Sequence, residues 1–367
     1  MPKFLDNLLN IFSKKTENSV LGVDIGASSI KIVQLKRKNG RAVLQTYGEI
    51  SLGPYASTEI GRATKLPPET IKEALRDLIL EAKVSTLNSA ISIPMRSSMV
   101  SVFKMPNMKD KQLSQMIPIE ARKYIPVPVA EVTLDWFVIP DIGAVDGKEP
   151  KKFVEAMVVA THNDVLSSYN SIVSLSDLQA SFFEVEMFST PRAVLDTTYN
   201  KPVMIIDIGA GATKVYITER GIVRDSHIIS RGSQDITLNA AKSIGVTVDY
   251  AEKLKRNYGQ NEDEHDKALK DVIDSIIGPI FSDAANILLN FQQKQKKDIS
   301  KVILVGGGSL LKGMKEKAQE RFGIEVVEAN PFSKIEVPAF LVDVLRETGL
   351  SFTVAIGLAL RKLQELE

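Results

Sequence analysis

Two segments of the sequence carry the same residues in the same order, each at the end of an apolar run. Residues 23–33 read VDIGASSIKIV and residues 206–216 read IDIGAGATKVY, and Asp24 and Asp207 are 183 positions apart. An aspartate that ends a strand presents its carboxylate at the sheet edge, and the glycine two residues later permits a tight turn with N–H groups open to an anion. Two such turns facing each other would hold a polyphosphate, with two carboxylates to anchor Mg²⁺ through water. The shared register argues against two unrelated hairpins.

Each copy lies among segments in which apolar and polar residues alternate, as they do along β-strands. The expected strands are 21–25, 30–36 and 41–50 for the first copy, and 203–208, 213–219 and 222–229 for the second. Asn39-Gly40 and Arg220-Gly221 are turn pairs of the kind that closes a two-residue hairpin. The sequence therefore predicts two duplicated strand-turn-strand units that position the two aspartates.

A third glycine cluster follows both copies. Residues 302–314, VILVGGGSLLKGM, predict a buried strand, a triple-glycine turn and the start of a helix that Ser309 could cap. A helix rich in small residues is expected at 351–363. The phosphate-binding motif G-x-x-x-x-G-K-[ST], the dinucleotide motif G-x-G-x-x-G and the hydrolase motif G-x-S-x-G do not occur in the sequence.

Composition excludes several classes of function. The 367 residues include 46 Lys+Arg and 45 Asp+Glu, so no basic surplus indicates a nucleic-acid binder. The absence of cysteine and the presence of only three histidines make a zinc site unexpected. No uncharged run reaches the roughly 20 residues of a membrane span, and Asp6 and Asn7 interrupt any signal-peptide core. A cytosolic location is expected.

The order of the motifs resembles a known superfamily. DIGASS, the middle segment FFEVEMF (182–188), DIGAGAT, VGGGSLL and AIGLAL follow one another as in actin, heat-shock chaperones and sugar kinases. Residues 119–136, 231–259 and 323–335 are similar to the PilM family of actin-like type IV pilus assembly proteins, and the likeness extends over nearly all of 20–363. It implies an α/β actin-like ATPase (ribonuclease H-like) fold with two duplicated lobes and inserted subdomains.

The resemblance divides the chain into five parts. These are an amphipathic N-terminal tail (1–18); the first lobe (19–88, 179–196 and 345–367); a subdomain inserted in it (89–178); the second lobe (197–232 and 300–344); and a helical insertion (233–299). The apolar stripe of the tail could lie on anionic lipid, dock on a partner or pack on its own domain.

The resemblance also implies ATP or ADP with Mg²⁺ as the ligand. Asp24 and Asp207 would be the metal and phosphate carboxylates, and Glu186 would take the place of a water-orienting acid. The implied cofactor-binding residues are Gly26, Ser28 and Ser29 in the first turn, Gly209, Gly211 and Thr213 in the second, Lys31 and Lys214 beside them, Gly306, Gly307 and Gly308 at the adenosine, and Glu252 with Lys255 at the ribose and adenine. The alternative for Glu252 and Lys255, which are spaced i,i+3, is a surface ion pair.

Two departures from the superfamily pattern predict at most slow ATP hydrolysis. Glu186 is followed by Met187 and then by Pro191, which we expect to kink or start a helix. The hydroxyl run of the second turn is thinned to Ala212-Thr213. Because phosphoryl transfer depends on positioning groups, a site that lacks some of them is expected to hold ATP better than it cleaves it.

The subdomain inserted in the first lobe carries its own pattern. Residues 90–95 and 99–106 predict paired strands, 132–140 and 151–162 predict further strands around the polar hairpin 143–152, and 109–126 and 163–177 predict helices, the second capped by Asn163. In the PilM family a groove beside this subdomain accepts the cytoplasmic N-terminal segment of the membrane protein PilN. The helix 109–126 is the expected area, although Tyr124, Ile125 and Pro126 equally suit a packed helix end.

The second insertion is expected to be helical. Its helices are predicted at 237–246, 248–257 and 271–295, with an acidic loop at 260–266, and the last helix repeats apolar residues at Ile273, Ile276, Ile277, Ile280 and Ile287, as a core helix does.

The expected function is a nucleotide-dependent cytoplasmic adaptor of the type IV pilus inner-membrane platform, peripheral to the membrane through PilN or the tail. Pilus motor ATPases are possible further partners, and a homo-oligomer is compatible with the sequence. The alternatives are a filament-forming protein like FtsA and, less favoured, a small-molecule kinase, for which Glu186 is the best candidate base.

Overall fold

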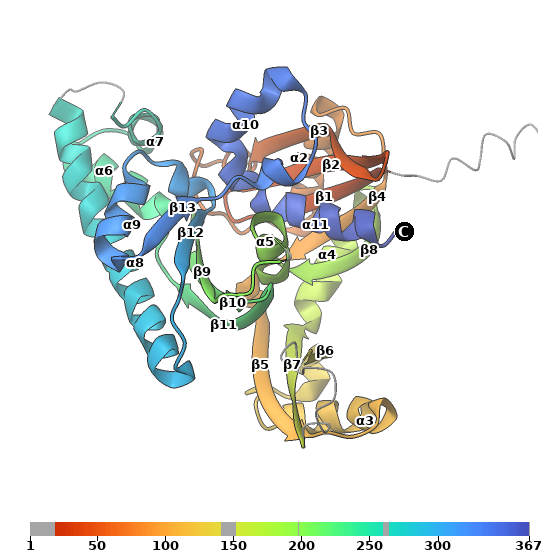
Figure 1. The fold of residues 1–367 in the computed structure, drawn as a ribbon. Helices are drawn as coiled ribbons and strands as arrows, with labels where there is room; N and C mark the ends of the chain where they lie inside the picture. Colours follow the sequence, from red (N-terminus) through yellow and green to blue (C-terminus); the bar gives the residue numbers. More distant parts are fainter. Residues whose placement is uncertain (1–18, 141–151, 197, 260–263, 367) are drawn as a thin grey trace, which may run out of the picture.

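The computed structural model describes residues 19–140, 152–196, 198–259 and 264–366. Figure 1 shows two sheets side by side, a group of helices beyond the second sheet, and a small sheet that extends from the first. The N-terminal tail, residues 143–151 of the expected hairpin 143–152 and residues 260–263 of the expected acidic loop lie outside the described residues.

The first five-stranded sheet has the order β3-β2-β1-β4-β8. Its strands are β1 (Ser19–Ile25), β2 (Ser29–Lys38), β3 (Arg41–Ser51), β4 (Asn88–Ile93) and β8 (Gln179–Val185). The first three are antiparallel, whereas β4 and β8 run parallel to β1 and to each other. Asn39 and Gly40 have φ values of 52° and 76°, which is the left-handed conformation of the predicted two-residue hairpin.

The second sheet repeats this arrangement in the order β11-β10-β9-β12-β13. Its strands are β9 (Val203–Ile208), β10 (Thr213–Glu219), β11 (Ile222–Ile229), β12 (Lys301–Val305) and β13 (Glu325–Glu328). Asp24 pairs with Lys31 in the first sheet, and Asp207 pairs with Lys214 at the same place in the second. The predicted duplication is therefore confirmed down to the register of the aspartates.

Helices cover both faces of the first sheet. On one face, α2 (Pro68–Glu81) and α4 (Asn163–Leu175) pack against the strands, and Leu75 and Ile172 are buried there with Leu21. On the other face lie α5 (Glu186–Val194) and α11 (Thr353–Gln364). The small residues of α11 allow this close packing, because a Cβ at Gly357 would stand 2.0 Å from the carbonyl oxygen of Ser189.

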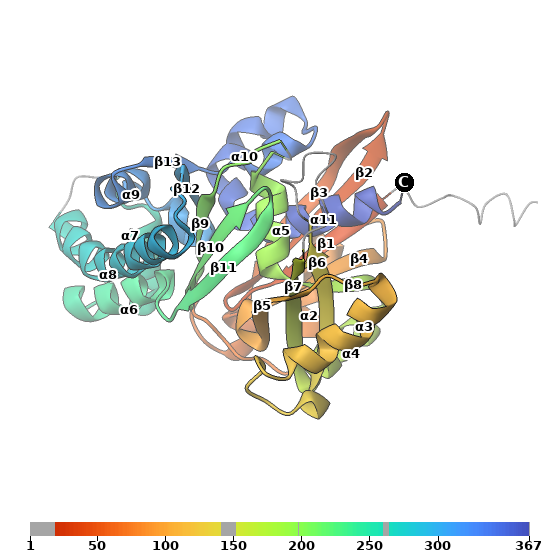
Figure 2. The same cartoon turned by 60° about the horizontal axis from the view of Figure 1, so that its bottom comes forward.

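The second sheet has an outer layer of helices, namely α6 (Ser233–Ile244), α7 (Val248–Arg256), α8 (Glu264–Gln295) and α9 (Met314–Phe322). Figure 2 shows them together on one side of the molecule. The predicted apolar stripe of α8 is confirmed: Ile273, Ile277 and Ile280 are buried in the core, and Ile276 and Ile287 pack against it. Within the described residues, α8 is the one helix long and apolar enough to cross a membrane, and its buried stripe shows a core helix.

The inserted three-stranded sheet has the order β5-β7-β6 and is covered by α3 (Asp110–Ala121). Its strands are β5 (Ser98–Pro106), β6 (Val132–Ile139) and β7 (Phe153–His162). The expected pairing of 90–95 with 99–106 is wrong. The first segment belongs to β4, whose partners are β1 and β8, and Pro94 with the 3-10 turn η2 (Met95–Ser97) redirects the chain before β5 begins.

Several local expectations also fail. Asn163 does not cap α4, because its amide donates to the Ala130 carbonyl and its Oδ1 accepts from Thr133. Ser309 donates to the Val305 carbonyl inside η4 (Gly307–Leu310), and α9 begins only at Met314. Pro191 lies inside α5, so of its two expected roles the start of the helix is wrong and a kink stays a prediction. Glu264–Asp266, expected in the acidic loop, already belong to α8.

The segment that follows β13 contacts the first sheet. Phe332 and Ile335, in and just after η5 (Pro331–Lys334), are buried with Val20 and Leu35 of the first sheet. The remaining short elements are η1 (Pro54–Ala56), η3 (Val129–Glu131), η6 (Ala339–Leu341), α10 (Val342–Thr348) and η7 (Gly349–Phe352). The division of the chain into domains at the expected residues stays a prediction.

Candidate functional site

A cleft of about 850 Å³ lies between the two lobes. Eight of the expected cofactor-binding residues line it: Ser28, Ser29, Lys31, Gly209, Glu252, Lys255, Gly307 and Gly308. They come from the first turn, the second turn, α7 and η4, which are far apart in the sequence. The fold thus brings parts of these motifs together at one cleft, whereas Asp24, Asp207 and Lys214 are not among the residues that line it.

The two aspartate turns have the same internal geometry. The Gly26 N–H donates to the Ser29 carbonyl at 3.0 Å, and the Gly209 N–H donates to the Ala212 carbonyl at 3.0 Å. A Cβ on either glycine would lie 3.0 Å from that same carbonyl oxygen. The two turns are therefore equally tight, and glycine suits both for the same reason.

A buried charged cluster lies beneath the second turn. Lys214 Nζ is 2.9 Å from Glu186 Oε2 and 3.5 Å from Asp207 Oδ2, and it is 3.6 Å from the position of a Cβ at Gly209. Burial acts to lower the pKa of Lys214, but Asp207 and Glu186 outweigh it and raise that pKa, so the ammonium stays charged. Burial raises the pKa of Glu186.

The first turn has a matching cluster. Ser92 donates to Asp24 Oδ1 at 2.8 Å, and burial raises the Asp24 pKa although Lys31 acts to lower it. Lys31 Nζ donates to Ser29 Oγ at 2.6 Å and is 3.2 Å from Glu49 Oε1. Burial pushes the pKa of Glu49 up, but Lys31 holds it below its usual value. Glu49 was not expected here, although its place opposite Lys31 in the hairpin was a usable signal.

At the other end of the cleft, Glu252 and Lys255 form a direct ion pair of 2.7 Å. Their side chains are only 7% and 11% exposed, so the alternative of a surface pair is wrong. Glu252 also accepts from Thr237 Oγ1 at 2.6 Å and from Arg256 Nε at 2.9 Å. Burial raises the Glu252 pKa, but Lys255 with these partners lowers it overall, whereas burial lowers the Lys255 pKa. Arg256 also lines the cleft and was not expected there.

The three glycines of the third cluster have different roles. Gly306 has φ +86°, and a Cβ there would lie 2.3 Å from Asp207 Oδ1, so glycine makes room for the aspartate. A Cβ at Gly308 would meet Ile208 at 2.4 Å. At Gly307 the nearest atom is the Ser351 Cβ at an ordinary contact distance of 3.8 Å, so this residue alone of the three has room for a side chain.

Three expected residues do not line the cleft and contact other parts of the protein instead. Thr213 is fully buried, and its hydroxyl donates to the Arg231 carbonyl at 2.9 Å. Gly211 lies against Ala63, whose Cβ would be 3.2 Å away from a Cβ at this glycine. Glu186 has both carboxylate oxygens bound, one by Lys214 and the other by the Met95 N–H at 2.9 Å.

A loop of the first lobe crosses the cleft, and no sequence pattern indicated it. In this crossing loop, residues 53–67, the Thr64 N–H donates to the Ala27 carbonyl in the first turn at 2.8 Å. The Ala63 N–H donates to Gln234 Oε1 on α6 at 2.9 Å. The loop therefore connects the two lobes directly above the turns.

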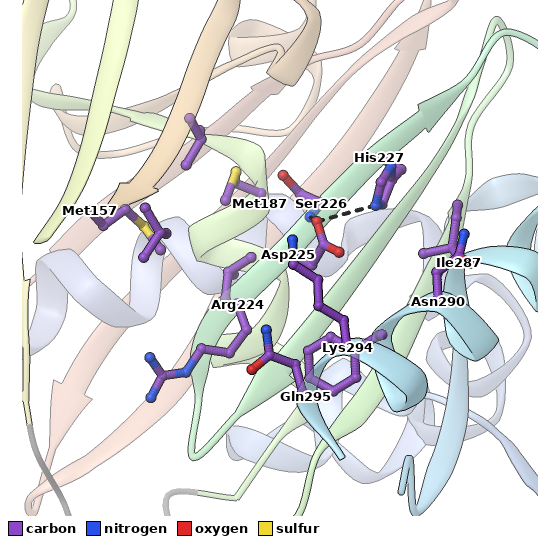
Figure 3. A pocket seen from close by; sticks show the side chains of 14 residues that line it. Met157, Met187, Arg224, Asp225, Ser226, His227, Ile287, Asn290, Lys294 and Gln295 are labelled. Atoms are coloured by element: carbon purple, nitrogen blue, oxygen red, sulfur yellow. Dashed lines mark hydrogen bonds and ion pairs between the residues drawn. The ribbon is translucent and has the colours of Figure 1, made fainter. Parts of the chain in front are cut away.

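A second cavity, of about 400 Å³, lies where β5, β7, α5, β11 and α8 meet (Figure 3). One wall is apolar and includes Val100, Val102, Met157 and Met187. The facing wall is polar and includes Arg224, Asp225, His227, Asn290 and Lys294. Arg224 Nη1 is 3.2 Å from Glu155 Oε2 on β7, so an ion pair spans from the second lobe to the inserted sheet.

The family model of the type IV pilus assembly protein PilM matches residues 22–363. The chain belongs to the PilM family. A solved PilM-PilN type IV pilus biogenesis complex has a chain that is 23% identical, with a TM-score of 0.79 over 94% of this chain and 98% of that one. The ethanolamine utilization protein EutJ from Carboxydothermus hydrogenoformans is 15% identical, with a TM-score of 0.55 over 93% and 89%. The predicted actin-like fold is therefore confirmed.

Curated relatives of this PilM-family chain are cell division proteins named FtsA. The protein from Staphylococcus epidermidis is 24% identical over 350 residues, which is 83% of this chain and 72% of the relative. That from Streptococcus pneumoniae is 23% identical over 354 residues, which is 84% and 75%. Both likenesses are distant and extend over most of the chain. They agree with the resemblance to FtsA that the sequence indicates.

Proposed function

We propose that this PilM-family protein binds ATP or ADP with Mg²⁺ between its lobes and serves as a cytoplasmic adaptor of the type IV pilus inner-membrane platform. In this role it binds the cytoplasmic N-terminal segment of a PilN-like membrane protein. The observation that carries the proposal is the pair of identical turns at one cleft, with Gly209 and Ser29 on its wall.

The cleft suits a polyphosphate with a divalent cation. Its volume lies in the range of small-molecule sites, about 300–1,000 Å³. Four carboxylates but only two ammonium groups stand around the turns, namely Asp24, Glu49, Glu186 and Asp207 against Lys31 and Lys214. Because this excess of negative charge would repel a bare polyphosphate, a cation must offset it.

Mg²⁺ is the cation that these oxygens suit, since it prefers hard oxygen ligands and keeps several waters. Within the described residues, no three histidine, aspartate or glutamate side chains gather closely enough to hold a metal ion by themselves. Phosphate oxygens and water would therefore complete the coordination, with Asp24 and Asp207 as the nearby carboxylates. ATP with Mg²⁺ would then contact both turns and hold the two lobes together.

The other end of the cleft suits the nucleoside. Glu252 is held ionised by Lys255, Arg256 and Thr237, and a carboxylate of this kind accepts hydrogen bonds from ribose hydroxyls. Gly307 also lines the cleft and carries no side chain, so a planar base could lie against its backbone. These contacts are consistent with the adenosine end that the resemblance implies.

The geometry favours holding ATP over cleaving it. Glu186 does not line the cleft, and each of its carboxylate oxygens already accepts a hydrogen bond, one from Lys214 and one from the Met95 N–H, so this side chain is poorly placed to orient an attacking water. The same argument disfavours a kinase, which needs a free base. Single-turnover hydrolysis much faster than about one per minute would contradict this part of the proposal.

The second cavity is the place we propose for the partner peptide. An extended segment can lay apolar side chains on Val100, Val102 and Met187 and direct its polar groups toward Arg224 and Lys294. The complex of a related chain is named as PilM-PilN, which supports PilN as the partner. Membrane attachment would then be peripheral, through PilN or through the N-terminal tail.

The test is calorimetric titration with ATP–Mg²⁺ and, separately, with a synthetic peptide of the cytoplasmic N-terminal segment of the PilN protein from the same bacterium. Val102→Asp should weaken peptide binding by at least about tenfold, or ~1.4 kcal/mol, because it places a charge on the apolar wall. Ile119→Asp is the matched control on α3, also exposed and apolar but not part of the cavity. Loss of binding only in the Ile119 variant would move the site to α3.

FtsA-like filament formation is the second candidate, favoured by relatives that align with most of the chain. It predicts ATP-dependent sedimentation of the purified protein. Pelleting that is independent of ATP, or absent at high protein concentration, would argue against ATP-dependent filament formation and favour the adaptor role.

A further inference from the structure

Glu186 connects three parts of the molecule through its two carboxylate oxygens. The residue is 6% exposed and begins α5, beside the first sheet. Its Oε2 is 2.9 Å from Lys214 Nζ on β10 of the second lobe. Its Oε1 accepts the backbone N–H of Met95 at 2.9 Å, at the start of the connection to the inserted sheet. A change at either partner must therefore alter the position or the charge balance of Glu186.

The Lys214 side of this bridge reaches the nucleotide cleft. The Lys214 ammonium lies beneath the second turn, 3.6 Å from the position of a Cβ at Gly209, and Gly209 lines the cleft. A polyphosphate at this turn would bring negative charge to the same ammonium that Glu186 now holds. The two would compete for Lys214, since each is attracted to one positive group in a partly dry environment.

The Met95 side of the bridge reaches the second cavity. Met95 is the first residue of η2, and β5 begins directly after η2 and contributes Val100 and Val102 to the cavity wall. Met187 follows Glu186 on α5, is fully buried and lines the cavity (Figure 3). Met95, Met187, Val159 and Val223 are members of one packed cluster. Glu186 is thus linked to the cavity both along the chain and through packed side chains.

We propose that Glu186 is a positioning residue that couples occupancy of the nucleotide cleft to the shape of the second cavity. The inference rests on the proposed function, because it concerns the regulation of the same peptide site. A ligand shifts a conformational equilibrium only by the difference in its affinity for the two states. Competition for Lys214 supplies that difference: the arrangement with Lys214 bound to Glu186 is disfavoured when phosphate charge is present. The Met95 and Met187 contacts then pass the change to the cavity wall.

Two reporters within the protein test this coupling without any partner. Hydrogen exchange of the Met95 amide reports on its bond to Glu186. The fluorescence of Trp136, the single tryptophan, reports on the inserted sheet, in whose core it packs. In the wild type, saturating ATP–Mg²⁺ should change both signals. In Glu186→Gln neither should respond, because the amide keeps an oxygen for the Met95 N–H but has no charge for Lys214.

Glu184→Gln is the matched control. Glu184 is also buried and lies two residues before Glu186, but its oxygens bind Arg192 and Arg361 and line neither cavity. This variant should lose stability and keep the wild-type response of both reporters. If it loses the response as Glu186→Gln does, the effect is one of general destabilisation and the inference is overturned.

A thermodynamic cycle with the PilN peptide then measures the coupling. ATP–Mg²⁺ should change the peptide Kd of the wild type by about fivefold or more and that of Glu186→Gln by less than about twofold, while Glu186→Gln still binds ATP. Equal coupling in both proteins would overturn the inference and leave the proposed function intact. A wild type that binds neither ligand would instead remove the proposed function, and separate titrations of the two ligands distinguish these outcomes.

Discussion

The backbone of Gly61 lies against the carboxylate of Glu252, so that a Cβ at Gly61 would stand 2.8 Å from the carboxyl carbon. Gly61 belongs to the crossing loop of the first lobe, and Glu252 belongs to α7 of the second. With the bonds from Ala63 to Gln234 and from Thr64 to Ala27, this contact connects the lobes over the cleft. A ligand that enters or leaves the cleft must therefore displace the loop or pass beside it.

Gly61→Ala should loosen this loop. Gly61 has φ +87°, where alanine is strained, and the added Cβ collides with the Glu252 carboxylate. We expect a loss of about 1–2 kcal/mol in the free energy of unfolding and faster release of a fluorescent ATP analogue in stopped flow. Gly40→Ala is the control, because it has a similar φ of +76° with nothing within 4 Å, in a hairpin that does not line the cleft. Equal release rates in the two variants would contradict a gating role for the loop.

Lys255→Met should weaken nucleotide binding. It removes the 2.7 Å partner of a buried carboxylate, so the pKa of Glu252 should rise and its ability to accept hydrogen bonds should fall. We expect a loss of about tenfold in ATP affinity, or ~1.4 kcal/mol, measured by calorimetry. Lys253→Met on the same helix is the control, because Lys253 is exposed and does not line the cleft. If Lys255→Met binds ATP with unchanged affinity, the Glu252–Lys255 ion pair does not contribute to nucleotide binding.

The repeat of the two aspartate turns could be predicted because the two segments share identical residues at a constant offset in the sequence. Asp24 and Asp207 each occupy the next-to-last position of a strand, and local turn chemistry at Gly26 and Gly209 dictates the same geometry twice. The two hairpins and the apolar stripe of α8 were also predictable, because each is determined by residues that lie close together in the sequence.

The features that could not be predicted depend on contacts between distant segments. The crossing loop has no periodic pattern, and only the folded chain brings Ala63 to Gln234. The second cavity is assembled from five elements, so no single segment indicates it. The sequence predicts the wrong partner for β4, because its apolar run lies close to β5 in the sequence, whereas its parallel neighbour β8 lies far along the chain.

Gly357→Ala should destabilise the first lobe severely. A Cβ at this position would stand 2.0 Å from the Ser189 carbonyl oxygen, and neither α11 nor α5 can move without opening the core behind Ala355 and Ile356. We expect a loss of about 2–4 kcal/mol in the free energy of unfolding in urea. Gly307→Ala is the comparison, because its nearest neighbour is at an ordinary 3.8 Å. That variant should keep its stability and lose ATP affinity instead, and a stable Gly357→Ala would refute the close packing.

The ion pair between Asp225 and His227 in the wall of the second cavity should make stability depend on pH. His227 Nε2 is 3.1 Å from Asp225 Oδ1, and this hydrogen bond raises the pKa of His227 above 6.5. Burial raises the Asp225 pKa, but His227 lowers it overall below 3.8. The stabilisation that comes from the raised pKa of His227 is complete below about pH 6.5 and is lost as the pH rises through the folded pKa of this residue. The stabilisation that comes from the lowered pKa of Asp225 is present above about pH 3.8 and is lost as the pH falls through the folded pKa of that residue. The pair therefore stabilises the fold in the mildly acidic range between these limits.

Asp225→Asn should accordingly lower Tm at about pH 5.5 and much less at about pH 8.5, where His227 is neutral in both proteins. The side chains are more than 40% exposed, so a shift of roughly 1–2 °C is expected. Asp343→Asn is the control, because its partner Arg346 keeps its charge throughout this range, and any effect on Tm should be the same at both pH values. An Asp225→Asn effect that is equal at the two pH values would show that the pair contributes through shape and not through charge. Protonation of His227 also adds positive charge to the cavity wall where we propose the peptide to lie, so peptide affinity in the wild type should change as the pH crosses the folded pKa of His227. In Asp225→Asn the same change should occur at a lower pH, because the hydrogen bond that raises this pKa is lost.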